Sequence, residues 1–254
     1  MILLKKKLGQ HFLHDNNTID KIIRNIGPTT NDYFIEIGPG DGAITIPLSN
    51  KVKYLTVIEK DARLIPKIME KLPRNSPVKT INQDILKYNF QGNRRNNLRL
   101  VGNLPYNIST EIIFKILDIA SKIKDIHFMM QKEVVDRMIA KPGSKEYGRL
   151  SVMAQIYFST KKLFDISPNV FFPKPKVMSS YIRLIPNSFP FDDKQHEERF
   201  KNIVTAAFTG RRKMVKTSLK KFLDEISLRK LSIDPTIRPE MISTKNFLKI
   251  SKLV

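Results

Sequence analysis

The first half of this chain alternates short apolar segments with segments of helical periodicity, and this alternation constrains the fold most strongly. The apolar segments have the length and composition of buried strands, and they cover residues 33–37, 54–58, 78–82, 98–101 and 125–130. Between them, apolar residues recur at helical spacing, as in Ile112, Ile113, Ile116 and Leu117. Because strands that alternate with helices form a parallel sheet covered on both faces, we predict an α/β, Rossmann-like fold.

The chain changes character near residue 190. Residues 186–193 are rich in Pro, Ser and Asp, which is typical of a linker. Beyond them the apolar residues keep only the helical period, as in Phe200, Ile203 and Val204. We therefore predict a ligand-binding α/β domain over residues 1–189 and a small all-α domain over residues 190–254.

The chain is strongly basic. Lys and Arg number 45 and Asp and Glu 24 among 254 residues, which gives a net charge of +21. This surplus favours a polyanionic partner, above all nucleic acid, because basic surfaces gain affinity by releasing counterions from phosphates. A lysine-rich composition that merely solvates the surface is the alternative.

Features that the sequence lacks narrow the compartment and the kinds of site that we expect for this protein. The chain has no cysteine, which excludes disulfides and cysteine-ligated metal sites and fits a reducing compartment. We find neither a signal-peptide pattern nor an apolar run long enough for a membrane span, so we expect a cytoplasmic protein without a membrane partner. His11 and His14 lack the supporting ligands of a metal site, and we expect no metal.

Three predicted strands end in residues suited to a nucleoside. Gly38 and Gly40 follow the first strand, where glycines let the backbone approach a ligand. Glu59 ends the second strand and can accept both ribose hydroxyls, and Asp84 after the third can accept from an adenine amine. Parallel strands end at one edge of the sheet, so these side chains should meet there.

The glycines alone do not decide the cofactor. Gly38, Gly40 and Ala43 also fit the fingerprint of nicotinamide dinucleotide sites, which leaves an oxidoreductase as an alternative. Pro39 counts against it, because proline removes a backbone donor from a loop that must bind pyrophosphate. S-adenosylmethionine has no phosphate, so its binding depends less on the backbone donor that Pro39 removes. An ordinary strand–helix turn is the third interpretation.

The segment Asn103-Leu104-Pro105-Tyr106 follows the fourth strand and is the most specific signal in the chain. The Asn103 amide oxygen and the Leu104 carbonyl can accept both hydrogens of an exocyclic amine. Pro105 fixes the backbone, and Tyr106 can stack on a base flipped out of its helix. The pattern resembles the motif of adenine amino-methyltransferases, although a plain proline turn would also fit.

Several further segments match one family, in its order and over nearly the whole chain. They cover residues 8–13, 36–40, 57–59, 103–109, 130–134, 147–152, 172–177 and 207–213. The chain resembles the ribosomal RNA adenine dimethyltransferases. It is most similar to their bacterial small-subunit branch and less similar to the large-subunit enzymes that confer macrolide resistance.

The resemblance implies a specific reaction. The enzyme would transfer four methyl groups from S-adenosylmethionine to N6 of two adjacent adenines near the 3′ end of 16S rRNA. Its partner would be a precursor of the small (30S) subunit, on which it would act as a monomer. The family's cofactor contacts fall on His11, Leu13, Gly38, Glu59, Asp84 and Asn103, with His11 standing where many relatives have Asn.

The resemblance also implies RNA contacts. Tyr106 and either Phe171 or Phe172 would sandwich the flipped adenine; the alignment favours Phe171, and the other phenylalanine would pack in the core. In the smaller domain Arg211, Arg212 and Lys213 are expected to contact phosphates, unless they only solvate a helix face. A ribosome-assembly factor that binds without methylating is the remaining rival.

Overall fold

The computed structural model describes residues 10–90, 96–210 and 212–254. The chain divides into two compact units, one made of Met1–Val135 and Lys161–Pro186 and the other of Asp136–Thr160 and Asn187–Val254. This division differs from the predicted boundary at residue 190. The helix α6 (Arg149–Tyr157) belongs to the second unit, because it packs against α7 (Lys194–Ala207) and α10 (Thr244–Leu253).

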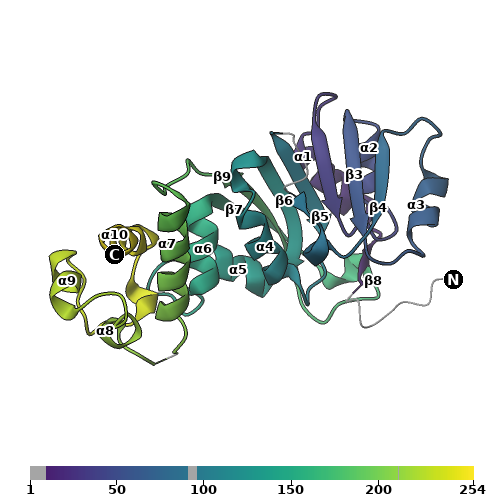
Figure 1. Cartoon of the computed structure of the whole chain (residues 1–254). Helices are drawn as coiled ribbons and strands as arrows, with labels where there is room; N and C mark the ends of the chain where they lie inside the picture. The colour runs from purple at the N-terminus through teal and green to yellow at the C-terminus, as the bar shows by residue number, and fades with distance from the viewer. Residues whose placement is uncertain (1–9, 91–95, 211) are drawn as a thin grey trace. The chain divides into compact units, whose positions relative to one another are not determined.

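The first unit is built on a seven-stranded sheet of order β4-β3-β2-β5-β6-β9-β7 (Figure 1). The five predicted strands are present as β2 (Tyr33–Ile37), β3 (Tyr54–Glu59), β4 (Val78–Asn82), β5 (Leu98–Asn103) and β6 (Ile123–Gln131). They pair in parallel, as predicted. β7 (Phe158–Ile166) and β9 (Ser179–Pro186) were not predicted. β9 pairs antiparallel with β6, so the complete sheet is mixed.

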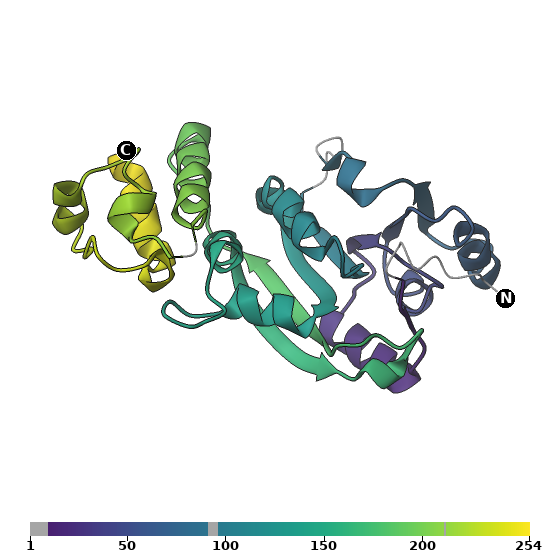
Figure 2. The same ribbon diagram turned by 90° about the horizontal axis from the view of Figure 1, so that it is seen from below.

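Helices cover both faces of this sheet. α1 (Asn16–Ile26) and α2 (Thr45–Ser49) bury Ile22, Ile26 and Leu48 in a core with Leu55 and Val57 of β3. α4 (Ser109–Leu117) lies on the face opposite α1 (Figures 1 and 2). This unit also contains α3 (Ile65–Lys71) and short turns at η2 (Ile85–Lys87), η4 (Ala120–Lys122) and η5 (Pro168–Val170). The division between the two units falls inside α5 (Lys132–Ile139).

Helix α1 shows how the local sequence sets its limits. The Asp15 side chain accepts a hydrogen bond from the Thr18 backbone N–H at 2.7 Å, which caps the first turn. Gly27 ends the helix at φ 55°, in the left-handed conformation that glycine adopts without strain. The strand just before this helix, β1 (Phe12–Leu13), forms a two-stranded antiparallel sheet with β8 (Phe171–Phe172).

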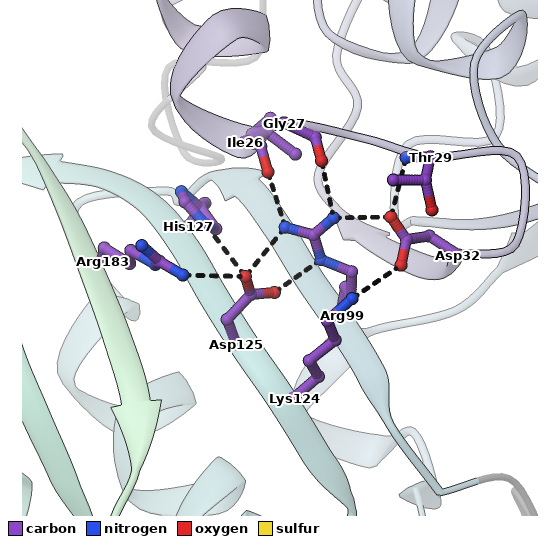
Figure 3. A network of polar contacts seen from close by, with 9 residues as sticks. All are labelled: Ile26, Gly27, Thr29, Asp32, Arg99, Lys124, Asp125, His127 and Arg183. Atoms are coloured by element: carbon purple, nitrogen blue, oxygen red, sulfur yellow. Dashed lines mark hydrogen bonds and ion pairs between the residues drawn. The ribbon is translucent and has the colours of Figure 1, made fainter.

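A buried charge network joins the amino ends of the central strands (Figure 3). Arg99 on β5 donates to Asp125 on β6 and to Asp32 before β2, both at 2.7 Å. It also donates to the backbone carbonyl of Ile26 at the end of α1, at 2.6 Å. All three charged side chains are buried, so each charge is balanced inside the protein.

The second unit is helical. Besides α6, α7 and α10 it contains α8 (Val215–Ser218), α9 (Glu225–Lys230) and the turn η6 (Pro239–Met241). Phe200 and Ile203, which the sequence places on one helical face, are fully buried in α7, and Phe247 and Ile250 are fully buried in α10. Across the described parts of the chain, none of the helices has the length and apolarity needed to cross a membrane.

Candidate active site

A cavity lies where β2, β3, β4 and β5 end. It is lined by all of the residues predicted to bind the cofactor or the amine, together with the predicted stacking ring of Tyr106: His11, Leu13, Gly38, Glu59, Asp84, Asn103, Leu104, Pro105 and Tyr106. These residues are separated by up to about ninety positions in sequence, yet they all belong to the first unit. The parallel register explains their meeting, because it brings the carboxyl ends of neighbouring strands to one edge.

The glycine loop forms one wall of the cavity. Gly38 and Gly40 have φ angles of 65° and 62°, which side chains other than glycine rarely adopt. The Gly38 N–H donates to the Ile58 carbonyl at 3.0 Å, and this bond joins the loop to the end of β3. A Cβ atom on Gly38 would stand 3.7 Å from the Asn103 carbonyl oxygen. The bare backbone therefore keeps the space between the two loops open.

Glu59 and Asp84 present carboxylates with fixed orientations. Glu59 accepts from the Asp61 backbone N–H at 2.7 Å and from the Gly40 N–H at 3.4 Å, while burial raises its pKa. Asp84 pairs with Lys60 at 2.7 Å, and this contact lowers the pKa of Asp84. Carboxylate oxygens have further lone pairs, so both side chains can still accept bonds from a nucleoside.

The cavity also contains acceptors to which the sequence analysis gave no role. Glu36 is fully buried, accepts a hydrogen bond from Thr45 Oγ1 at 2.7 Å, and has a pKa raised to about 8 by its burial. Gln10 donates to Asp61 at 3.3 Å, and its buried Oε1 atom has no partner among the described residues. A glutamate inside an apolar strand was the available signal for Glu36.

The Asn103-Leu104-Pro105-Tyr106 loop is fixed from several sides. The Asn103 amide nitrogen donates to the His11 carbonyl at 2.8 Å, which leaves the amide oxygen as an acceptor at the cavity. Leu104 is buried, and its N–H donates to the Met129 carbonyl at 3.0 Å. The Tyr106 ring stacks on the His11 ring with centroids 5.3 Å apart. Its hydroxyl contacts Ser179 Oγ at 2.5 Å.

Phe171 does not lie where the alignment suggested. It is 2% exposed and packs in the apolar core with Leu13 and Ile22, whereas Phe172 is 63% exposed. The reason is the strand pairing: Phe171 lies opposite the buried Leu13, and Phe172 opposite Phe12, which lines the cavity. Side chains alternate along a strand, so only one of the two can face outward. Phe172 is therefore accessible from outside the protein, and Phe171 is not.

The predicted phosphate-binding residues belong to the second unit. Arg211 lies outside the described residues, and Arg212 and Lys213 are exposed. Lys216, which follows them, pairs with Glu225 at 3.1 Å. Within the ranges described above, we find no group of three or more His, Asp or Glu residues arranged to hold a metal ion.

Comparison with solved structures defines the class of protein. The fold superposes with a TM-score of 0.73 on the 23S rRNA methyltransferase ErmE, at 25% identity over 95% of this chain and 98% of that one. A dimethyladenosine transferase from Plasmodium falciparum gives a TM-score of 0.82, at 24% identity over 94% of this chain and 96% of the other. The fold and the site thus define a Rossmann-like, S-adenosylmethionine-dependent methyltransferase.

Sequence relatives identify the family. The family model for ribosomal RNA adenine dimethylase matches residues 1–254. A ribosomal RNA small subunit methyltransferase A from Nitrosococcus oceani is 42% identical over 98% of this chain and 95% of its own length. The protein of that name from Acinetobacter baylyi is 42% identical over 97% and 91%. The chain belongs to the ribosomal RNA adenine dimethylase family, and the nicotinamide alternative is therefore wrong.

The residues of the cavity fit S-adenosylmethionine. Glu59 would accept the ribose hydroxyls, Asp84 the adenine amine, and the unpartnered Oε1 of Gln10 offers one more acceptor. The glycine loop leaves room beside them for the amino-acid part of the ligand. S-adenosylmethionine supplies a methyl group bonded to a positively charged sulfur, which an amine nitrogen can attack.

Proposed function

We propose that this enzyme dimethylates N6 of two adjacent adenines in a hairpin loop near the 3′ end of 16S rRNA. The observation that carries the proposal is the orientation of the Asn103 amide beside the cofactor cavity. Its nitrogen is bound to the His11 carbonyl, so its oxygen is left to accept a hydrogen from an exocyclic amine. The small-subunit relatives match almost the full length of the chain, which supports this target.

Positioning is the main source of catalysis in this proposal. The N6 lone pair of adenine is delocalised into the ring and is a poor nucleophile. Asn103 and the Leu104 carbonyl would hold the two amine hydrogens and favour a pyramidal nitrogen whose lone pair points at the methyl group. Such alignment can supply much of the rate without a strong base. The proton released after transfer can pass to water.

Aromatic rings would hold the flipped base. Tyr106 supplies one of them, since it is half-buried at the cavity. For the second we propose Phe172, because it is exposed and Phe171 is buried. Stacking contributes about 1–3 kcal/mol per base, so either ring alone would hold the adenine less firmly.

The proposed substrate is a precursor of the small ribosomal subunit in the cytoplasm, and the enzyme is proposed to act on it as a monomer. Arg211, Arg212 and Lys213 would contact phosphates of the rRNA and position it without reading its bases. No metal enters the proposed reaction. Dimethylation of large-subunit rRNA and assembly without methylation are the two competing functions.

Nucleoside mass spectrometry separates these functions. The enzyme and S-adenosylmethionine would be incubated with small-subunit particles from cells that lack the modification, and in parallel with large-subunit rRNA. We expect N6,N6-dimethyladenosine only in the small-subunit sample. The variant Tyr106→Ala should lose the product, whereas Tyr106→Phe should keep most of it because the ring remains. Product only in the large-subunit sample would overturn the target, and particle binding without any product would favour the assembly role.

A further inference from the structure

His11 contacts three separate parts of the proposed catalytic site. Its carbonyl oxygen accepts from the Asn103 amide at 2.8 Å, and its ring stacks on Tyr106. Its Nδ1 atom lies 2.6 Å from the carbonyl oxygen of Pro173, in the loop that follows β8. One residue near the N-terminus therefore joins the amine-binding amide, the proposed stacking ring and the segment that carries Phe172.

The contact with Pro173 fixes the imidazole. A carbonyl oxygen can only accept, so Nδ1 must carry the proton in this bond. The bond holds the ring in one orientation over Tyr106, with an interplanar angle of 29°. Tyr106 is held at its far end by the contact between its hydroxyl and Ser179.

The stack also limits where a base can bind. One face of the Tyr106 ring is covered by the imidazole of His11, which leaves the other face for an adenine. A tyrosine held by a neighbouring ring and a hydroxyl contact is already fixed in position before the base arrives. Preorganisation of this kind matters most for the reacting geometry, because a small misplacement of the amine costs rate more than binding.

We propose that the His11 side chain is a positioning residue, which backs Tyr106 and thereby sets the approach of the adenine to the methyl group. This inference rests on the proposed function. It differs from a role as a cofactor contact, in which the imidazole would bind S-adenosylmethionine itself. The two roles predict different kinetic effects.

Two substitutions at His11 separate the effect of the aromatic ring from the effect of the Nδ1–H donor. His11→Phe keeps an aromatic ring and removes the Nδ1–H bond to Pro173, whereas His11→Asn keeps an N–H donor and removes the ring. Neither alters the backbone carbonyl that binds Asn103. His14→Asn is the matched control, because His14 is exposed and close to His11 in the sequence.

The first readout is kinetic, with small-subunit particles and saturating S-adenosylmethionine. We expect His11→Asn to lower kcat about tenfold and His11→Phe less than about threefold, with KM for the particle unchanged. The Kd of the cofactor, measured by calorimetry, should change less than about twofold in both, which also shows that both variants are folded. His14→Asn should match the wild type.

The second readout is spectroscopic and needs no substrate. The chain has only 4 histidines, so their imidazole protons can be assigned by NMR. In Tyr106→Leu, the His11 ring protons should lose the upfield shift that a stacked aromatic ring causes, and those of His14 should not move.

Different results would overturn different conclusions. A tenfold weaker cofactor Kd in His11→Asn with an unchanged kcat would make His11 a cofactor contact. Equal losses of kcat in both variants, or an unshifted His11 spectrum in Tyr106→Leu, would remove the stacking role while the proposed function stands. If the wild-type enzyme methylates neither rRNA, the proposed function fails and the inference fails with it.

Discussion

Three carboxyl groups at the cofactor cavity have raised pKa values, so they lose their protons less readily than usual. Burial raises the pKa of Glu36 to about 8 and also raises the pKa values of Asp41 and Glu59. The groups reinforce one another, because an ionised Glu59 or Asp41 disfavours a second negative charge on Glu36. At neutral pH the Glu36 carboxyl is therefore mostly protonated and uncharged.

These raised pKa values predict that the preference of the cavity for the positively charged cofactor depends on pH. As the pH rises through about 8, Glu36 ionises and attracts a sulfonium. The affinity for S-adenosylmethionine, relative to its uncharged-sulfur product S-adenosylhomocysteine, should rise about three- to tenfold between pH 6.5 and 9. Calorimetric titration of both ligands measures this ratio, in which the amino groups that they share cancel. In Glu36→Gln the ratio should become flat, and a slope that survives there would exclude Glu36 as its source.

The two neighbouring phenylalanines should respond in opposite ways. Phe171→Ala removes a buried ring and should lower the free energy of unfolding by about 3–5 kcal/mol. Phe172→Ala removes an exposed ring, so stability should stay within about 0.5 kcal/mol while methylation of the particle falls. Urea unfolding and the nucleoside assay measure the two effects. A stable but inactive Phe171→Ala enzyme would return the stacking role to Phe171.

At the scale of elements, the close approach of β2 and β5 brings the two functional loops together. A Cβ atom on Gly102 would stand 2.5 Å from the Ile37 carbonyl oxygen, which is closer than atoms can pack. Gly102 directly precedes Asn103, and Ile37 directly precedes Gly38. The missing side chain thus lets the glycine loop and the Asn103–Tyr106 loop share one cavity.

Gly102→Ala should therefore force the strand ends apart. We expect a loss of about 1–3 kcal/mol in unfolding free energy and a weaker Kd for S-adenosylmethionine. The matched control is Gly148→Ala, because Gly148 has an extended backbone and open space around its missing Cβ. Chemical denaturation and calorimetry of both variants test this, and equal behaviour of the two would contradict the argument.

The charge network at the other end of the strands should make stability depend on acid. Contacts with Arg99 and His127 hold the pKa of Asp125 far below its usual value, and hydrogen bonds lower that of Asp32. Carboxylates with lowered pKa values stabilise the fold above pH about 4 and lose this contribution as the pH falls toward their folded-state pKa values. We expect unfolding free energy to fall between pH 5 and pH 2.

Asp125→Asn tests the network directly. It leaves the buried guanidinium of Arg99 with one carboxylate fewer, and should cost about 3–5 kcal/mol at pH 7 while flattening the acid dependence. Asp20→Asn provides the control, because Asp20 is exposed and is not among the residues of the network (Figure 3). An Asp125→Asn enzyme of wild-type stability at pH 7 would show that the network is dispensable.

At the scale of the whole molecule, we expect the net charge of +21 to make binding to RNA strongly dependent on salt. Each cation that neutralises a phosphate releases a counterion, so the affinity for the particle should fall steeply as salt rises. We expect Arg212→Gln and Lys213→Gln each to reduce the slope of log Kd against log salt by about one. Lys79→Gln, on β4 in the first unit, is the control. An unchanged slope in both test variants would remove them from the RNA interface.

Local sequence patterns are enough to predict the alternation of elements and the edge of the sheet at which the ligand-binding residues collect. Periodicity and strand-end residues suffice for this, because parallel pairing always brings the carboxyl ends together. Glu59, Asp84 and Asn103 were therefore predictable as neighbours, although Asn103 lies 44 positions from Glu59. His11 follows none of these strands, and only the family resemblance placed it with them. The Asn103–Tyr106 loop was predictable because its four residue types suit a single chemistry.

Contacts between distant segments set which side chains are exposed and which carboxyl groups keep a proton at neutral pH. Phe171 and Phe172 are adjacent residues of the same type, so the local sequence does not distinguish them. The pairing of β8 with β1 sets which one is buried and which one is exposed. The antiparallel β9 and the raised pKa of Glu36 likewise depend on what packs around them. Burial and register arise from contacts between distant segments, and local patterns do not contain that information.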